Sequence, residues 1–225
     1  MLRSLPQLTQ ADFGDWSAEQ LAWLAAEPIP IQLKSVGIIR RVGSAHAASL
    51  ARLPNLTFLS GGLMLEDASF IGSLRKLQIV DLRCEPQVDV QRLMAALAQC
   101  SDISSLTLSH PQLGAAHLAT LLPHLPRLDE LRFVDCPELR SLSFLSSTPH
   151  LTSILSKFVL VNCVSLPPSE LVYVQQLGSL EELTLHRSFT SPLDAFTLAA
   201  FAPDQPLMRL RANPKLRKFD STPPS

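Results

Sequence analysis

The sequence predicts an α/β solenoid, curved, with a parallel sheet on its concave side and helices and irregular turns on its convex side. Three observations predict it. A short phrase with apolar residues at its first, fourth and sixth positions recurs, and stretches with helical apolar spacing lie between its copies. Hydrophobic residues make up 46% of the chain, but aromatic residues only 6%. Recurrence at a fixed step of about 20 to 50 residues is typical of a solenoid, because one repeat cannot bury its apolar face alone.

The phrase predicts one strand per repeat. Its clear copies lie at 77–82, 103–108, 128–133, 155–160 and 180–185. Their fourth residues are Val80, Leu106, Leu131, Phe158 and Leu183, which are 26, 25, 27 and 25 residues apart. Because side chains alternate along a strand, the apolar positions point into the core and the residues between them point outward on the concave side.

The N-terminal third is predicted from local signals. Residues 1–30 are expected to form a helical cap, with a helix over 16–24 that Ser17 and Gln20 begin as a capping box and Pro28 and Pro30 end. Terminal repeats need such a cover. A strand is expected over 31–36 and a helix over 44–53, and the phrase at 53–61 is expected to be distorted at Gly61, where a leucine would fit.

The segments that connect one copy of the phrase to the next are called returns here. The later returns are mostly predicted to be helical. Apolar residues at helical spacing predict helices over 88–98, 113–122, 169–177 and 193–201, whereas 136–156 is predicted to be a short extended return. Repeats are expected over 31–200. Residues 201–225 are expected to form a C-terminal cap and frayed tail, with one loose copy of the phrase at 216–219.

Alternating strands and helices could also form a doubly wound parallel sheet. The strands argue against it, because polar residues alternate within them, and a strand covered on both faces is a nearly continuous apolar run. A glycine-rich phosphate loop is also missing from a chain with only 8 glycines.

The phrase resembles that of leucine-rich repeat proteins over residues 31–190. Five residues after the fourth position, where this family has Asn or Cys to satisfy backbone groups of the turn, stand Cys136 and Cys163. Glu85, Pro111 and Ser188 depart from the pattern at this position. The cysteine turns and helical returns are similar to the intracellular cysteine-containing and ribonuclease-inhibitor-like types. The resemblance implies non-catalytic protein recognition by a monomer.

Bulk properties restrict the partners and the compartment. A net charge of −1 and a pI near 6.6 give no field that favours nucleic acid or an anionic membrane. The sequence contains no unbroken apolar run of about 18 residues, so no membrane span is expected. Four scattered cysteines are expected to be reduced thiols, and the start lacks the apolar run of a secretion signal, so a cytoplasmic location is expected.

The cysteines and histidines are the candidate metal ligands and nucleophiles of this sequence. His110, His117 and His124 recur every seven residues, but Pro111 interrupts them, and the cysteines belong to different repeats. We therefore expect no metal site and no cofactor. Without a Gly-x-Ser-x-Gly elbow or a defined Cys–His pair, no catalytic residue is assigned.

The outward residues of the strands are the candidate partner-binding residues. They are Asp81, Arg83, Glu130, Arg132, Val134, Lys157, Val159, Val161, Glu182, Thr184 and His186. Glu130, Lys157 and Glu182 occupy equivalent positions on successive strands, about 5 Å apart. Two interpretations stay open: they pair laterally and solubilise the sheet, or they form the polar part of an interface whose apolar centre is Val134, Val159 and Val161.

We therefore expect a protein partner on the concave face. Two alternatives remain at this point: a substrate-recognition subunit of a ubiquitin ligase, or a repeat fragment of a bacterial effector or a receptor. The first alternative would place a ligase-scaffold site in the N-terminal segment, for which residues 1–30 offer little support.

Overall fold

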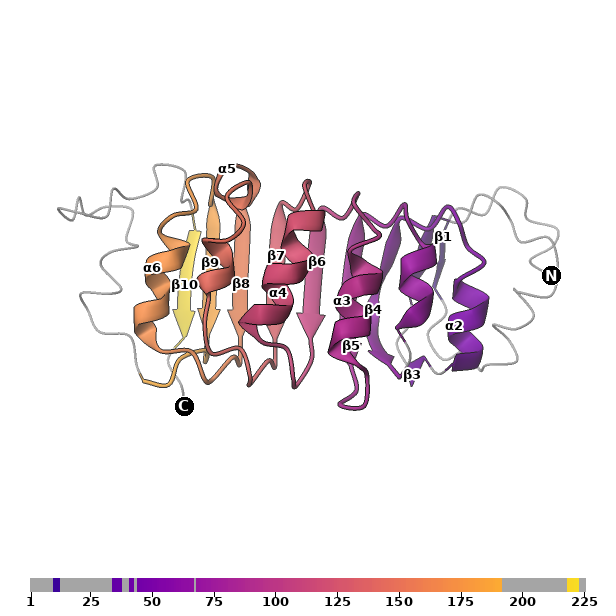
Figure 1. The fold of residues 1–225 in the computed structure, drawn as a ribbon, viewed down its shortest axis with the longest axis horizontal. Coiled ribbons are helices and arrows are strands. Elements are labelled where there is room, and N and C mark those ends of the chain that lie inside the picture. The colour runs from indigo at the N-terminus through magenta and orange to yellow at the C-terminus, as the bar shows by residue number, and fades with distance from the viewer. Residues whose placement is uncertain are drawn as a thin grey trace. The chain divides into compact units, whose positions relative to one another are not determined.

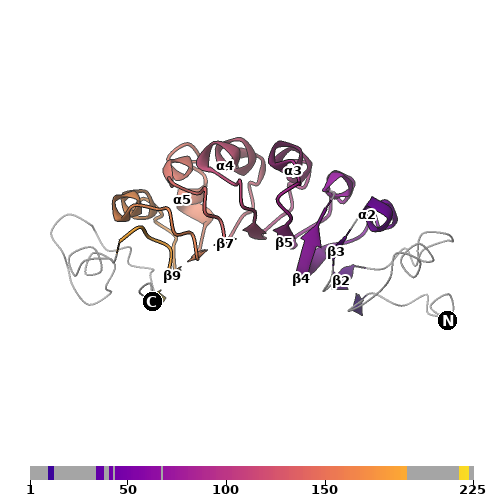
Figure 2. The same cartoon turned by 90° about the horizontal axis from the view of Figure 1, so that it is seen from below.

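The structure is a computed structural model, and it describes residues 10–12, 34–37, 41–42, 44–66, 68–191 and 218–222. The chain divides into two compact units, Met1–Leu108 and Ser109–Ser225. Within each unit, parallel strands form one layer, and helices and short 3-10 turns lie on one side of it (Figure 1 and Figure 2). This is the layered arrangement that the sequence predicts for each repeat.

The strands of the first unit follow one another in parallel. β1 (Gln10–Asp12) pairs with β2 (Ser35–Gly37), β2 with β4 (Phe58–Leu65), and β4 with β5 (Ile79–Cys84). The short β3 (Arg41–Val42) also pairs with β4. β6 (Ser105–Ser109) reaches the boundary of the unit and starts beside β5, since the backbone N–H groups of Ser104 and Ser105 both donate to Gln78 O.

In the described part of the first unit, two helices and a 3-10 turn lie between the strands. They are α2 (Ser44–Leu50), η2 (Ser69–Ser73) and α3 (Val90–Leu97). The side chain of Asp89 caps α3 by accepting from the N–H groups of Gln91 and Arg92, at 2.9 and 3.2 Å. All four residues of the predicted apolar stripe of α3, spaced at i, i+3, i+4 and i+7, are buried.

The distortion expected near Gly61 is present in β4. This strand has 8 residues, and its register with β5 shifts between Leu59 and Leu63. Leu59 lies opposite Val80 and Leu63 lies opposite Leu82, so three residues of β4 lie between these pairs where β5 has one. The two extra residues form a bulge in β4.

The strands of the second unit are parallel and in simple register. β7 (Glu130–Val134), β8 (Lys157–Val161), β9 (Glu182–His186) and β10 (Lys218–Thr222) lie in that order. Residues of equivalent position in the phrase are register partners, as predicted. The described part of the loose copy at 216–219 lies in β10, where Phe219 is opposite Leu183 although 36 positions separate them in the sequence.

The returns of the second unit are shorter than predicted. α4 (Ala115–Leu121) continues into η3 (Leu122–His124), and the helix predicted over 169–177 is η5 (Pro168–Glu170) followed by α6 (Leu171–Val174). The extended return predicted for 136–156 is wrong in part, because it contains η4 (Ser143–Leu145) and a single turn, α5 (Leu151–Ile154). Thr148 supports η4 by donating to Phe144 O at 2.9 Å.

The core of the second unit is built around Phe133. Its ring meets those of Phe144 and Phe158 edge to face, with centroids 5.9 and 6.2 Å apart. Phe144 comes from the return and Phe158 from the next strand, so one side chain joins two repeats and both layers. Leu131, at the other inward position of β7, is fully buried.

One short strand lies within each of the two predicted end regions. β1 lies inside residues 1–30, where only a helical cap was expected, and β10 lies inside the predicted tail. The strand predicted over 31–36 is β2, which begins at Ser35, and the helix predicted over 44–53 ends at Leu50. The helices predicted over 16–24 and 193–201 fall outside the described residues.

Within the described part of the chain, every helix is too short or too polar to cross a lipid bilayer.

Candidate functional site

The outward side chains of β7, β8 and β9 form a surface that we call the strand face. Burial alternates along β7 and β9, and the buried residues face the helical returns, so the residues between them face away. The strand face consists of Glu130, Arg132, Val134, Lys157, Val159, Val161, Glu182, Thr184 and His186. The register arranges them in three rows that run across the strands.

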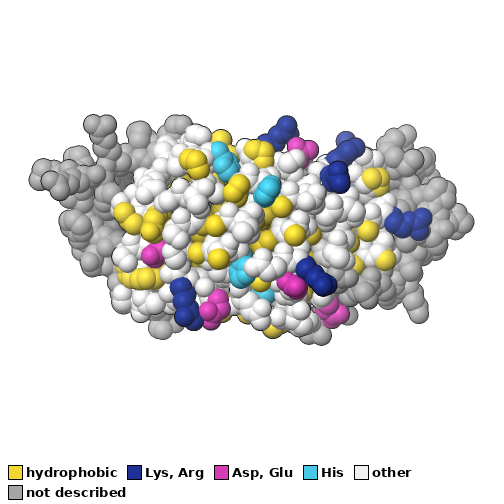
Figure 3. Space-filling view, in the orientation of Figure 1, with side chains coloured by type: hydrophobic (Ala, Val, Ile, Leu, Met, Phe, Trp, Pro, Cys, Tyr) yellow, Lys and Arg dark blue, Asp and Glu magenta, His cyan; other side chains and the backbone are white. Residues whose placement is uncertain are grey.

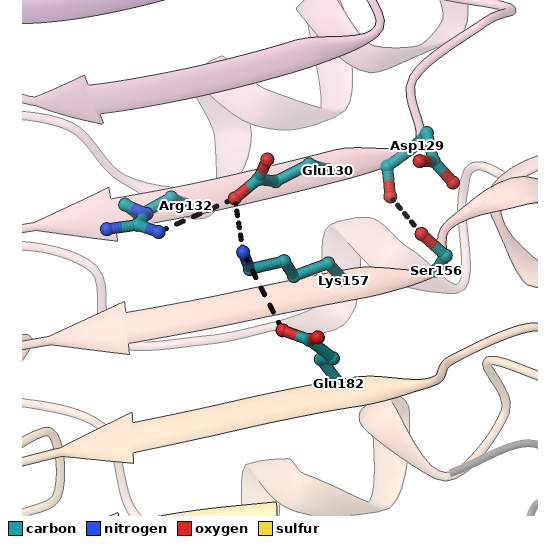
Figure 4. A network of polar contacts seen from close by, with 6 residues as sticks. All are labelled: Asp129, Glu130, Arg132, Ser156, Lys157 and Glu182. Atoms are coloured by element: carbon teal, nitrogen blue, oxygen red, sulfur yellow. Dashed lines mark hydrogen bonds and ion pairs between the residues drawn. The ribbon is translucent and has the colours of Figure 1, made fainter. Parts of the chain in front are cut away.

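The first row is a chain of charges (Figure 4). Lys157 Nζ lies 3.1 Å from Glu130 Oε1 and 3.6 Å from Glu182 Oε2. Arg132, from the second row, adds an ion pair of 3.5 Å to the same Glu130 oxygen. The lateral pairing that the sequence left open is therefore present. Two cations and two carboxylates balance, so this cluster carries no net charge.

The third row is mainly uncharged. Val134, Val161 and His186 are register neighbours, and each is partly exposed. They lie at the carboxyl ends of the strands, beside the charged cluster. A partner would thus meet aliphatic and aromatic groups next to polar ones.

Val159 corrects the predicted interface. We expected it in the exposed apolar centre, but its exposed fraction is only 3%. It lies at the middle of the middle strand, with Arg132 and Thr184 as register partners on its two sides and Lys157 and Val161 before and after it on the same face. A small side chain surrounded on four sides is covered by its neighbours, so Val159 supports the face and offers little area to a partner.

The two remaining candidates belong to the first unit. Asp81 is partly exposed and Arg83 is exposed, and both lie on β5 with Ile79, which is 40% exposed. The three residues alternate with Val80 and Leu82, which are buried, so they share the outward side of that strand.

A recurring turn ends each strand of the face. Asp135, Asn162 and Arg187 directly follow β7, β8 and β9, and all three have a positive φ, of 52°, 55° and 49°. The next residue in each case is buried: Cys136, Cys163 or Ser188. Sequence reasoning missed the left-handed residues. The available signal was Asp or Asn before a buried Cys, since these residues tolerate that conformation best after glycine.

The buried residue of each turn satisfies the backbone, as predicted for the two cysteines. Cys136 Sγ donates to Val134 O at 3.4 Å and Cys163 Sγ to Val161 O at 3.6 Å. Ser188, which departs from the family pattern, donates to His186 O at 2.8 Å and therefore fills the same role.

The two thiols of this turn differ in pKa. Cys136 and Cys163 are hydrogen-bonded to each other; this bond, together with burial, raises the pKa of Cys163, and the same bond lowers the pKa of Cys136. Because the thiolate is the nucleophilic and metal-binding form, the raised pKa of Cys163 favours a structural role for that thiol. All four cysteines are buried and outside any disulfide. Within the described residues, no three His, Cys, Asp or Glu side chains lie close enough to hold a metal ion.

Two histidines on the side of the returns have structural roles. Nδ1 of His110 accepts from the N–H of Gln112 at 3.0 Å, and Nδ1 of His117 accepts from the N–H of Gly114 at 3.1 Å. His110 is only 1% exposed. Figure 3 shows this side of the molecule: histidines and apolar side chains are scattered over it, and the charged ones lie mostly towards its margins.

The first unit has a surface hollow of about 320 Å³, lined by residues that include Glu66, Asp89 and Arg92. Asp89 caps α3 with one carboxylate oxygen, and its other oxygen lies 3.6 Å from Arg92 Nε. Asp89 and Arg92 are thus engaged with each other, and Asp89 also with the helix.

Comparison with known proteins identifies the fold. No family model matches the sequence, and no curated protein matches it. Among solved structures, the chain is similar to internalin C2 of Listeria monocytogenes, with 15% identity and a TM-score of 0.51, over 92% of this chain and 84% of that one. Internalin F of the same bacterium gives 14% identity and a TM-score of 0.43, over 91% of this chain and 62% of that one. Internalins are leucine-rich repeat proteins, and the present chain has the leucine-rich repeat solenoid fold that its sequence predicts.

Proposed function

We propose that this chain is a non-catalytic protein-binding module and that the strand face of β7, β8 and β9 holds its partner. The observation that carries the proposal is the makeup of this face. Val134, Val161 and His186 lie partly exposed beside a charged cluster whose net charge is zero. Apolar groups with a polar border are what protein interfaces combine.

The charge balance supports a protein partner over a nucleic acid. Nucleic-acid binding depends on cations that neutralise phosphates. Here each cation of the face lies within 3.6 Å of a carboxylate, which weakens the attraction for a phosphate chain. A folded protein or an extended segment makes mixed contacts and does not require a positive field.

Lateral pairing and partner binding are compatible. Exposed or partly exposed ion pairs contribute roughly 0–1 kcal/mol each to stability. A partner can therefore rearrange Lys157, Glu130 and Glu182 at small cost. The pairs keep the face soluble while it is empty.

Affinity capture from the cells that make the protein tests the proposal, with quantitative mass spectrometry as the readout. A strand-face variant combines Arg132→Ser, Lys157→Ser and Val161→Ser; Val161 is chosen because Val159 is buried. A matched control changes exposed residues of the returns, His124→Ser, Arg140→Ser and Val172→Ser. All three proteins must first show the same circular dichroism and cooperative unfolding.

We expect a protein that the wild type and the control both retain and that the strand-face variant loses. A partner that the strand-face variant still retains at wild-type level would contradict the proposal. Loss in the control alone would move the interface to the side of the returns.

We also propose that the chain works in a reducing compartment such as the cytoplasm. Four buried cysteines outside any disulfide support this, because Cys136, Cys163 and Cys100 each donate to backbone carbonyls as thiols. Alkylation under denaturing conditions, on protein isolated from its own cells, should label four thiols. A disulfide in that material would refute the assignment.

A further inference from the structure

Two arginines of the second unit each pair with a glutamate two residues earlier, but the two ion pairs differ in length and exposure. Arg140 lies two residues after Glu138, and its Nη2 atom is 2.9 Å from one carboxylate oxygen and 3.2 Å from the other. Arg132 lies two residues after Glu130, and its ion pair is 3.5 Å long. The exposed fractions run the other way: 69% for the Arg140 side chain and 38% for Arg132. Arg132 is therefore the more desolvated of the two cations and the less well paired.

The carboxylate beside Arg132 is also shared. The same Glu130 oxygen that Arg132 approaches lies 3.1 Å from Lys157 Nζ, so the lysine is the nearer cation. A guanidinium carries five N–H donors in a planar fork. Figure 4 shows one terminal nitrogen of Arg132 facing Glu130 while the opposite end of the guanidinium faces away. Much of its capacity to donate is thus not used by Glu130.

We propose that Arg132 anchors an acidic side chain, Asp or Glu, of the protein partner; this rests on the proposed function of the strand face. A carboxylate can take two parallel hydrogen bonds from the fork, which a lysine cannot offer. The partial burial of Arg132 makes such a bond stronger than one in open solvent. Val134 follows Arg132 on the same side of β7, and Val161 is its register partner. The partner residue beside the acid is therefore apolar.

A single carboxylate fits this place better than a phosphate chain does. Glu130 and Glu182 both belong to the cluster, and they would repel successive phosphates that extend across the strands. One acidic side chain meets only the free end of the guanidinium. A segment with an isolated acid next to aliphatic residues is the occupant that the charges favour.

Selection of random linear peptides displayed on phage, against the intact chain, tests the anchor. Enriched peptides are synthesised, and their dissociation constants are measured for the wild type and for single variants. We expect the enriched peptides to share an Asp or Glu next to an apolar residue. Arg132→Gln should weaken them at least about tenfold, as the loss of a charge-assisted bidentate contact does. The control Arg140→Gln, whose arginine is also paired with a glutamate, should leave binding unchanged.

The remaining outcomes separate the anchor from the proposed function. Peptides that bind wild type and Arg132→Gln equally, but lose affinity with Val161→Ser, overturn the anchor and leave the strand face in place. Peptides whose affinity no strand-face substitution changes would contradict both the anchor and the proposed function of the strand face. Enriched peptides without an acid, a selection that enriches none, or a single-stranded oligonucleotide that binds through Arg132 each overturn the anchor. Replacing the acid of a peptide by its amide should abolish the difference between wild type and Arg132→Gln.

Discussion

The left-handed residues at the strand ends show how one position constrains the side chain it can hold. Asp135 and Asn162 are residue types that tolerate a positive φ, and the Asn162 amide donates to the Asp135 carboxylate at 2.9 Å. Arg187 occupies the equivalent place with a φ of 49° and has no such local advantage. A non-glycine residue in this region costs roughly 1–2 kcal/mol.

Arg187→Gly is therefore expected to stabilise the protein by about 0.5–1 kcal/mol, because relief of the strained backbone exceeds the extra entropy of glycine in the unfolded chain. The midpoint of urea unfolding measures it. Arg140→Gly serves as the control, since Arg140 is not among the residues with a positive φ, and it should lower stability. Equal losses in both variants would contradict the account.

A second residue-scale prediction concerns alkaline pH. Burial raises the pKa of the Cys100 thiol from 9.0 to about 11, against a smaller opposing effect of the Arg75 charge. Between about pH 9 and 11 the unfolded chain loses this proton and the folded chain keeps it. The free energy of unfolding should therefore fall as the pH rises through this window.

The measurement is the urea midpoint of wild type and Cys100→Ala at pH 7.5 and at pH 10, two conditions chosen around that window. The variant loses the hydrogen bonds to Ile71 O and Leu74 O, so it is less stable at both values. The urea midpoint of the variant should nevertheless fall less between pH 7.5 and pH 10 than that of the wild type. Parallel declines would show that Cys100 does not contribute.

At the scale of elements, the strands were predictable and the returns only in part. A strand of this fold needs little more than apolar residues at alternate positions, which β5, β7 and β9 supply. The returns must cover a fixed length of sheet with whatever residues remain. In 136–156 and 166–177 this produced 3-10 turns and helices of 4 residues, too short to show a helical period.

The helix α3 gives a clean test of local stability. Asp89→Ala removes the acceptor for the N–H groups of Gln91 and Arg92 and should cost about 1 kcal/mol. Asp89→Asn keeps an oxygen at the same place and should cost much less. Chemical denaturation of the two variants measures the loss of stability in each. If both lose the same amount, the lost charge and not the cap is responsible.

The aromatic cluster tests how the repeats are joined in the second unit. Phe133→Ala should cost about 3–5 kcal/mol, because the cavity would lie between Phe144 of the return and Phe158 of β8. Phe133→Leu, the family's usual residue at this place in the phrase, should cost less. Calorimetry would measure both. A cost below about 1 kcal/mol for Phe133→Ala would show that Phe133 does not join the layers.

At the scale of the molecule, the sequence predicted the repeat fold and which residues belong to the strand face. It did not predict how exposed each of these residues is. The outward positions follow from alternation alone. The burial of Val159 depends on the size of four neighbours on three strands, which no local pattern encodes. The strand at 10–12 was hard to anticipate because it extends the sheet by pairing and has no clear copy of the phrase, whereas a loose copy indicated the strand at 218–222.

Hydroxyl-radical footprinting of the chain, alone and with its captured partner, tests the central claim most directly. It reports the solvent access of individual side chains by mass spectrometry. We predict protection of Val134, Val161 and His186 on the strand face and unchanged oxidation of His124 and Val172 on the returns. Protection of His124 and Val172, with Val134, Val161 and His186 oxidised as before, would contradict it.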